Sequence, residues 1–173
     1  PEGGGAVRGG TPRRRMMGRG AKNSGTHAAE RGGDATAAPL FFPKPTPAVV
    51  GRGRARVRPP QSQRTDFEGE LAVVIGRVAK NVPASAALDY VFGYTIGNDV
   101  TARDLQQADG QWARAKGFDT FCPLGPAIET DFDLGGGARI VTRVDGEVRQ
   151  DGPISDMVHS VPDIIAYASA AFT

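Results

Sequence analysis

The chain has 173 residues, the size of one ordinary domain, and its apolar fraction of 39% is enough to build a core. A single cysteine excludes an internal disulfide framework and a cysteine-based zinc site, and no apolar run approaches the roughly 18 residues that span a bilayer. The net charge of +2 hides an uneven distribution, because residues 1–65 hold 13 Lys and Arg against three acids, whereas residues 66–173 hold 8 against 16. The N-terminus lacks the apolar core of a signal peptide, so we expect a cytoplasmic protein.

The first 18 residues are rich in Gly, Arg and Pro and have no hydrophobic periodicity, which predicts a disordered basic tail. No aromatic residue is interleaved with the arginines of this tail, so the stacking platform of a nucleic-acid-binding arm is missing. Residues 19–173 contain no internal repeat and are predicted to form one domain.

The first half of this domain alternates extended segments with short turns. Prolines punctuate Pro39–Val50, and each favours an extended conformation in the residue before it. Alternating side chains predict a strand over Asp66–Val78, and the apolar, aromatic segment Tyr90–Asp99 predicts a second, buried strand. A helical turn over Ala84–Leu88 is expected between the two strands.

Two local motifs follow the second predicted strand. Thr101 and Asp104 match a capping box, so a short helix should continue through about Ala108. Lys116 then lies in a segment flanked by Gly and Pro that also contains two phenylalanines, which predicts a loop that packs inward.

The C-terminal third has two clear signals. Asp145-Gly146 between Ala138–Val144 and Glu147–Gln150 predicts a hairpin. A serine three residues before an aspartate, with a proline in the first turn, predicts a helix over Ser160–Phe172. Together the elements predict an α+β fold dominated by β-structure, a mixed-sheet roll.

The acids near the two predicted strands are candidate metal ligands. Glu68 and Glu70 are two residues apart, so their carboxylates point the same way from Cα atoms about 6.5–7 Å apart. Repulsion and lost hydration in an apolar strand would favour a bound cation, and carboxylate oxygens suit Mg²⁺, Mn²⁺ or Ca²⁺. The alternative is that both glutamates lie on the solvent face of an edge strand. Asp99 ends the next strand and is either a third ligand or a cap of the following helix, while Lys116 is either a surface lysine or a group that neutralises an enolate.

His27 and Glu30 are candidates for acid–base chemistry. Their spacing of three residues places both side chains on one face of a helical turn. A carboxylate beside an imidazole fixes its tautomer and raises its basicity, which suits a general base for water. An exposed, flexible pair is the alternative. Cys122 lies between Phe121 and Pro123, which predicts a packed thiol and not a nucleophile.

Four segments, DFEGELAVVIG, GYTIGNDVTARDLQ, GQWARAKGFDTFCPLGP and VDGEVRQDG, resemble the fumarylacetoacetate hydrolase family in order and spacing. The resemblance implies a mixed β-roll, a homodimer and an Mg²⁺ or Mn²⁺ ion held by three carboxylates. By motif position, those carboxylates fall on Glu68, Glu70 and Asp99.

The same resemblance implies roles for five further residues. The active-site lysine of the family falls on Lys116, and substrate contacts fall on Gln106 and Arg103. The segment AKNSGTHAAERGG is similar to a family motif in which a His and a Glu lie on a lid over the substrate, which implies these roles for His27 and Glu30.

The activity that the resemblance implies is metal-dependent hydrolysis of a C–C bond in acylpyruvates or other diketo acids, through a stabilised enolate. One alternative is an isomerase or decarboxylase of seven-carbon dioates in aromatic catabolism. The chain ends at AAFT, where family members continue with a P-G-D strand and a T-G-T-P loop. A truncated, inactive fragment with weak polyanion binding is therefore a third expectation. For either enzymatic hypothesis the expected partner is a small keto-acid substrate, and no hypothesis includes a membrane.

Overall fold

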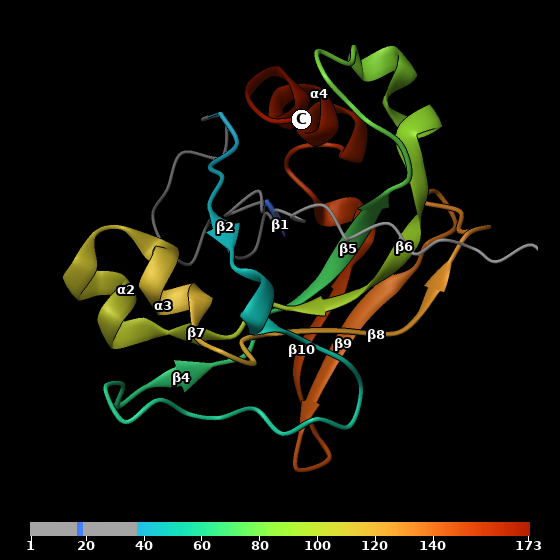
Figure 1. The fold of residues 1–173 in the computed structure, drawn as a ribbon. Helices are drawn as coiled ribbons and strands as arrows, with labels where there is room; N and C mark the ends of the chain where they lie inside the picture. The colour runs from blue at the N-terminus through green and yellow to red at the C-terminus, as the bar shows by residue number, and fades with distance from the viewer. Residues whose placement is uncertain (1–16, 19–37) are drawn as a thin grey trace, which may run out of the picture.

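The computed structural model describes Met17–Gly18 and residues 38–173, and its largest sheet has four strands in the order β3-β8-β6-β5 (Figure 1). The strands are β3 (Val49–Val50), β8 (Cys122–Glu129), β6 (Val91–Asn98) and β5 (Gly69–Ile75). β3 runs parallel to β8, while β8 with β6 and β6 with β5 are antiparallel. This mixed sheet, with few helices around it, confirms the predicted α+β fold.

Short strand pairs and helices surround this sheet. The pairs are β1 (Met17–Gly18) with β2 (Pro43–Lys44), β4 (Thr65–Asp66) with β7 (Thr101–Ala102), and β9 (Arg139–Val144) with β10 (Glu147–Pro153). The helices are η1 (Thr46–Ala48), η2 (Ala84–Tyr90), α2 (Arg103–Asp109), α3 (Trp112–Gly117), η3 (Ile154–Asp156) and α4 (Val161–Ala171). Of the predicted basic tail, only Met17–Gly18 lies within the described residues.

The main core lies where α4 and η2 cover one end of the sheet (Figure 1). Ser160 caps the start of helix α4, and its Oγ accepts a hydrogen bond from the Asp163 N–H, in keeping with the predicted helix start. The core cluster consists of Val82, Ala87, Tyr94, Val161 and Ile165. Strand β5 joins it through the side chains that share one face of the strand, which is why the apolar alternation of this segment could be seen in the sequence.

A second apolar cluster supports the part of the fold that holds α2. It contains Val100, Ala102 and Phe121, with Leu105 and Phe118 packed against it. The inward-packing aromatic segment is therefore confirmed, but the predicted loop at Lys116 is wrong, because this residue lies in α3. A helix of six residues is too short for apolar periodicity to reveal it.

The capping box predicted at Thr101 is wrong, although the helix that it predicted is present. Thr101 lies in β7, where its Oγ1 donates to the Asp99 carbonyl at 2.9 Å, and helix α2 begins at Arg103. Asp104 accepts a hydrogen bond from the Gln63 N–H at 2.7 Å instead of closing a box. Because Thr101 pairs with Asp66 in the β4–β7 ladder, it is extended and does not cap the helix.

The strand predicted over Asp66–Val78 is divided. β4 ends at Asp66 and β5 begins at Gly69, because the Glu68 N–H donates to the Asn98 side chain at 2.9 Å instead of continuing a ladder. The hairpin at Asp145-Gly146 is confirmed. Within the described ranges no helix is long and apolar enough to cross a membrane.

Candidate metal centre

Three carboxylates converge beside the edge of the main sheet. Glu68 immediately precedes β5, Glu70 is its second residue, and Asp99 follows β6. One oxygen from each lies within 4.8 Å of the others. Glu68 is 7% exposed, Asp99 is 4% exposed and Glu70 is half-buried, so the two glutamates do not both lie on a solvent face.

The antiparallel pairing of β5 with β6 brings these acids together. Gly69 lies opposite Asn98 and Glu70 opposite Gly97, so the start of β5 meets the end of β6. Beyond the ladder, the Asp99 N–H donates to the Glu68 carbonyl at 2.9 Å. The carboxylates therefore project from two segments whose backbones are hydrogen-bonded to each other.

Lys116 of α3 reaches into this group of acids. Its Nζ donates to Asp99 Oδ2 at 2.5 Å, to Thr101 Oγ1 at 2.7 Å and to Glu68 Oε2 at 3.1 Å. The side chain is 1% exposed, and its Nζ also lies over the rings of Phe42 and Trp112. The positive charge offsets the repulsion among the acids, and the aromatic faces attract it further.

Lys44 is a second buried lysine at the site, and nothing in the sequence analysis identified it. It lies at the end of β2, is 4% exposed, and forms an ion pair with Asp99 Oδ1. Burial lowers the pKa of Lys44, although the charge of Asp99 opposes that shift. Its only local signal is a lone charge within an apolar, proline-rich segment.

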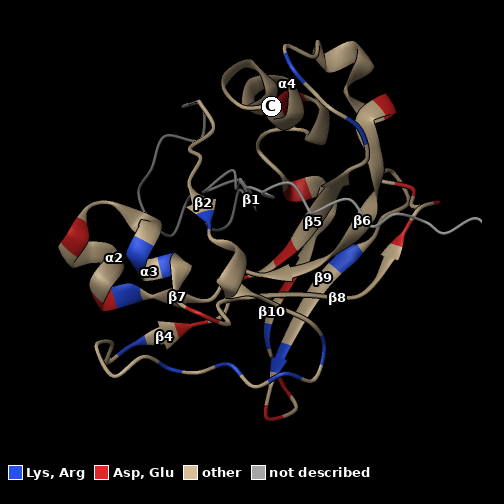
Figure 2. Cartoon of the chain, in the orientation of Figure 1, with Lys and Arg blue, Asp and Glu red and all other residues tan. Residues whose placement is uncertain are grey.

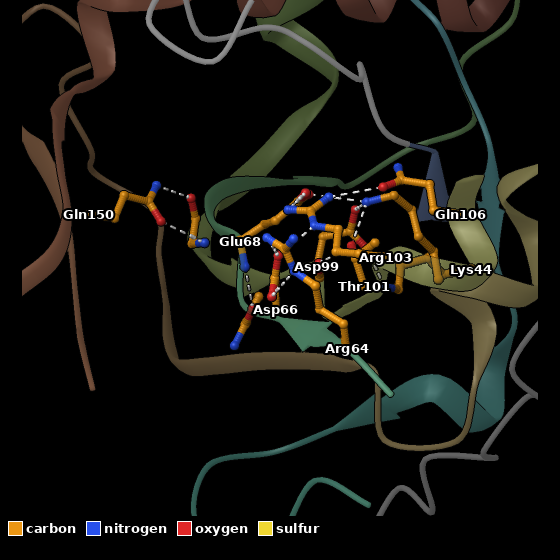
Figure 3. Close-up of polar contacts among 12 residues, drawn as sticks. Lys44, Arg64, Asp66, Glu68, Asp99, Thr101, Arg103, Gln106 and Gln150 are labelled. Carbon is orange, nitrogen blue, oxygen red and sulfur yellow. Dashed lines mark hydrogen bonds and ion pairs between the residues drawn. The ribbon is translucent and has the colours of Figure 1, made fainter. Parts of the chain in front are cut away.

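Arg103 connects the acids to the helix that follows. Its guanidinium donates through Nε to Asp66 at 2.9 Å, pairs through Nη2 with Glu68 Oε1 at 2.6 Å, and donates through Nη1 to Gln106 Oε1 at 3.0 Å (Figure 3). Burial raises the pKa of Asp66, but hydrogen bonds from Arg103 and Arg64 outweigh burial and lower it overall. Arg103 therefore contacts both Glu68 of the acid group and Gln106 of α2.

The donor set fits a hard divalent cation. Such ions bind oxygen at roughly 2.0–2.6 Å, so oxygens on opposite sides of one ion lie roughly 4–5 Å apart. The three carboxylate oxygens lie within 4.8 Å of one another, close enough for one ion to contact all of them. Because the donors are all carboxylates, Mg²⁺, Mn²⁺ and Ca²⁺ suit them better than zinc.

An open pocket of about 340 Å³ adjoins this centre through Arg103. Its lining residues are Arg64, Arg103, Gln106, Gln107 and Trp112. The pocket is lined by two arginines and no acid, so it suits an anionic group. Gln106, predicted as a substrate contact, lines this pocket beside Arg103, which also contacts Glu68.

Two predicted site residues have no described position. His27 and Glu30 both lie outside the described residues. Cys122 is buried as expected, and burial raises the pKa of its thiol. A packed thiol of this kind is a poor nucleophile.

Sequence comparison decides the family. The profile of the fumarylacetoacetate (FAA) hydrolase C-terminal family matches residues 18–173. The chain belongs to the fumarylacetoacetate hydrolase family. It is 49% identical over 155 residues to the protein Rv2993c of Mycobacterium tuberculosis, covering 88% of this chain and 58% of that protein. It is 40% identical over 157 residues to the oxaloacetate tautomerase YisK of Bacillus subtilis, covering 88% and 52%.

Solved structures of fumarylacetoacetate hydrolase relatives agree. The 5-carboxymethyl-2-hydroxymuconate delta-isomerase of Mycobacterium smegmatis superposes with a TM-score of 0.80 at 47% identity, over 87% of this chain and 60% of that one. The fumarylpyruvate hydrolase of Pseudomonas aeruginosa, in complex with Mn²⁺ and pyruvate, gives 0.76 at 34%, over 87% and 69%. The chain thus spans about 60% of the length of its similar relatives, and the family includes hydrolases, isomerases and tautomerases.

Proposed function

We propose that the three carboxylates hold a divalent cation and that the site stabilises the enolate of a 2-oxo acid. The reaction that we propose is proton transfer, of the kind that a tautomerase or isomerase catalyses. The observation that carries this proposal is the convergence of Glu68, Glu70 and Asp99 oxygens within 4.8 Å, with the Lys116 ammonium on two of the acids. When bound, the ion would act as a Lewis acid on substrate oxygens.

The chain's own residues supply the remaining chemistry of enolate formation. Lys116 presents a buried positive charge beside the acids, where it can stabilise an oxygen that becomes negative. Thr101 fixes the Lys116 ammonium from one side, so its direction is set before substrate arrives. Pre-organised charge of this kind costs little reorganisation during the reaction.

Charge distribution supports an anionic substrate. Residues 38–65 contain six Lys and Arg and no acid, and Figure 2 shows basic residues spread along the loop between β3 and β4, with Lys44 apart from them in β2. Arg64, the last of these six, lines the pocket beside Arg103. A keto acid with a second carboxylate suits these surroundings better than a neutral ketone does.

Hydrolysis of a C–C bond is the second candidate reaction. It needs a base for water in addition to the enolate-stabilising groups, and His27 with Glu30 is the pair proposed for that role. The hydrolase relative that carries Mn²⁺ and pyruvate supports this candidate. The chain is 40% identical to the oxaloacetate tautomerase and 47% identical to the delta-isomerase, but 34% identical to that hydrolase. We therefore place proton transfer first.

Assays with oxaloacetate, an acylpyruvate and a seven-carbon dioate, each with and without Mg²⁺ or Mn²⁺, separate the two reactions. Tautomerisation changes the enol absorbance of oxaloacetate without breaking a C–C bond, whereas hydrolysis of an acylpyruvate consumes water and releases pyruvate and a second carboxylic acid. Loss of both activities in His27→Ala would favour a base shared by the two reactions, and loss of hydrolysis alone would assign His27 to water.

The metal centre itself is tested by Glu70→Gln. We expect Mn²⁺ affinity, measured by isothermal titration calorimetry, to fall by more than roughly 100-fold. Substituting a residue that only hydrogen-bonds to a metal ligand already lowers metal affinity roughly 10–100-fold, and Glu70 is itself a proposed ligand. Glu129→Gln is the matched control, because Glu129 is exposed and accepts a hydrogen bond from its neighbour Asp131. Unchanged Mn²⁺ affinity in Glu70→Gln would remove the proposed centre.

A further inference from the structure

Gln150 of β10 makes two hydrogen bonds to the backbone of a single residue of β5 (Figure 3). Its Nε2 donates to the Gly69 carbonyl at 2.7 Å, and its Oε1 accepts from the Gly69 N–H at 3.0 Å. β5 is the edge strand of the main sheet, so these backbone groups point away from β6. The side-chain amide takes the place that a neighbouring strand would otherwise fill.

A third contact defines the orientation of this amide. Thr142 lies opposite Gln150 in the β9–β10 hairpin, and its Oγ1 donates to Gln150 Oε1 at 3.1 Å. With Oε1 accepting from both Thr142 and Gly69, the Nε2 group is left to donate to the Gly69 carbonyl. The amide is therefore oriented from its own hairpin before it meets β5.

The approach of the hairpin requires a glycine at this position. A Cβ on Gly69 would lie 2.3 Å from Thr142 Oγ1 and 3.1 Å from Gln150 Oε1. The first distance is too short for any carbon–oxygen contact, and the second is tight enough that the Gln150 amide would have to shift. The hairpin is thus packed directly on the backbone between Glu68 and Glu70.

Gly69 separates the two glutamates of the metal centre, and its peptide groups set the angle between them. On the side of β6, the Asn98 side chain accepts from the Glu68 N–H and the Asp99 N–H donates to the Glu68 carbonyl, both at 2.9 Å. On the opposite side the same segment is held by Gln150. Contacts from both sides fix the backbone from which the carboxylates project.

We propose that Gln150 is a positioning residue of the metal centre, holding the Glu68-Gly69-Glu70 backbone so that both carboxylates reach one cation. This inference rests on the proposed metal centre. Gln150 touches neither the cation nor the substrate in this role, and it acts through the two hydrogen bonds to Gly69.

Gln150→Met tests the inference, because methionine has a similar length and no charge but cannot make the paired hydrogen bonds. We expect the Mn²⁺ affinity to fall roughly 10–100-fold, the range for residues that orient metal ligands. We also expect the electron paramagnetic resonance lines of the bound Mn²⁺ to broaden, because the ligand geometry becomes less uniform. A purely structural role would lower the melting temperature without changing that spectrum.

Asp151→Asn is the matched control on the same strand, since it breaks the exposed pair with Arg139 and leaves Gln150 in place. Its Mn²⁺ affinity should equal that of the wild type. Thr142→Val removes the hydroxyl that orients the amide and should give a smaller loss of affinity, so it decides the question if Gln150→Met does not fold. Wild-type affinity in the folded variant overturns the role of Gln150 alone, whereas a wild-type chain that binds no Mn²⁺ overturns the metal centre as well.

Discussion

At the scale of single residues, the site depends on how a buried ammonium is compensated. Lys116 Nζ has three donors, and acceptors on Asp99, Glu68 and Thr101 lie within 3.1 Å of it. Taking a charge out of water costs several kcal/mol, and only a full set of such partners offsets that cost. These contacts hold the Lys116 Nζ at the position where the acids converge.

A pH effect is expected at Asp104, which ties the turn before β4 to α2. Hydrogen bonds from the Gln63 N–H and from Ser62 Oγ, each at 2.7 Å, lower the pKa of Asp104 below its ordinary value of 3.8. A carboxyl with a lowered pKa stabilises the fold above its unfolded pKa, and this contribution is lost as the pH falls through the folded value. Asp104→Asn should therefore lower the melting temperature at neutral pH, and its difference from the wild type should shrink as the pH falls below 3.8 and vanish once the pH is below the lowered pKa of the folded state.

Thermal melting followed by circular dichroism, from neutral pH to below 3.8, measures this difference. Asp145→Asn is a suitable control, since the β9–β10 turn accepts either residue. A difference that persists unchanged in acid would mean that Asp104 acts through packing and not through its charge.

At the scale of elements, the hairpin β9–β10 has an irregular register that serves the site. Val148 lies opposite Arg143, but the next pair is Gln150 with Thr142, so Arg149 is the extra residue of a β-bulge. Bulges re-aim the side chains that follow them. The bulge thus places Gln150, and not Arg149, opposite Thr142 and against Gly69.

The turn of this hairpin should be sensitive to substitution. Asp145 and Gly146 have φ of 51° and 83°, the positive values that a two-residue type I′ turn requires. Gly146→Ala should lower the free energy of unfolding by about 1–2 kcal/mol, the cost of a left-handed conformation for a residue with a Cβ. Urea unfolding measures this change, and Asp145→Asn should leave it near zero. An unchanged midpoint in Gly146→Ala would show that the hairpin does not depend on this turn.

Over the whole molecule, local patterns were predictable and distant contacts were not. The Asp-Gly hairpin, the Ser160 helix and the Glu68–Glu70 spacing all follow from residues that are close in sequence. Lys44 and Asp99 are 55 positions apart, and Gln150 and Gly69 are 81 apart, so no local period links them. At Thr101 a local motif predicted the wrong cap, because strand pairing with β4 decided its conformation.

The proposed metal centre joins segments that are far apart in the chain, so ion binding should stabilise the fold as a whole. Its acids lie at the start of β5 and just after β6, and Lys116 connects them to α3. A ligand that binds only the folded state stabilises it by about 2.7 kcal/mol at 100 times its dissociation constant. For a chain of this size, that corresponds to a rise of roughly 5–10 °C in the melting temperature.

Differential scanning calorimetry with increasing Mn²⁺ measures this linkage, with Mg²⁺ and Ca²⁺ as parallel titrations. The wild type and Glu129→Gln should show the same rise with the logarithm of Mn²⁺ concentration. Glu70→Gln should show little or none, because one of the three ligands has become a neutral amide that binds hard cations weakly. Removing Mn²⁺ with a chelator should return all three proteins to their metal-free midpoints. An equal rise in Glu70→Gln would mean that the ion stabilises the chain at a different place, since the acids of one centre cannot lose a ligand without losing affinity.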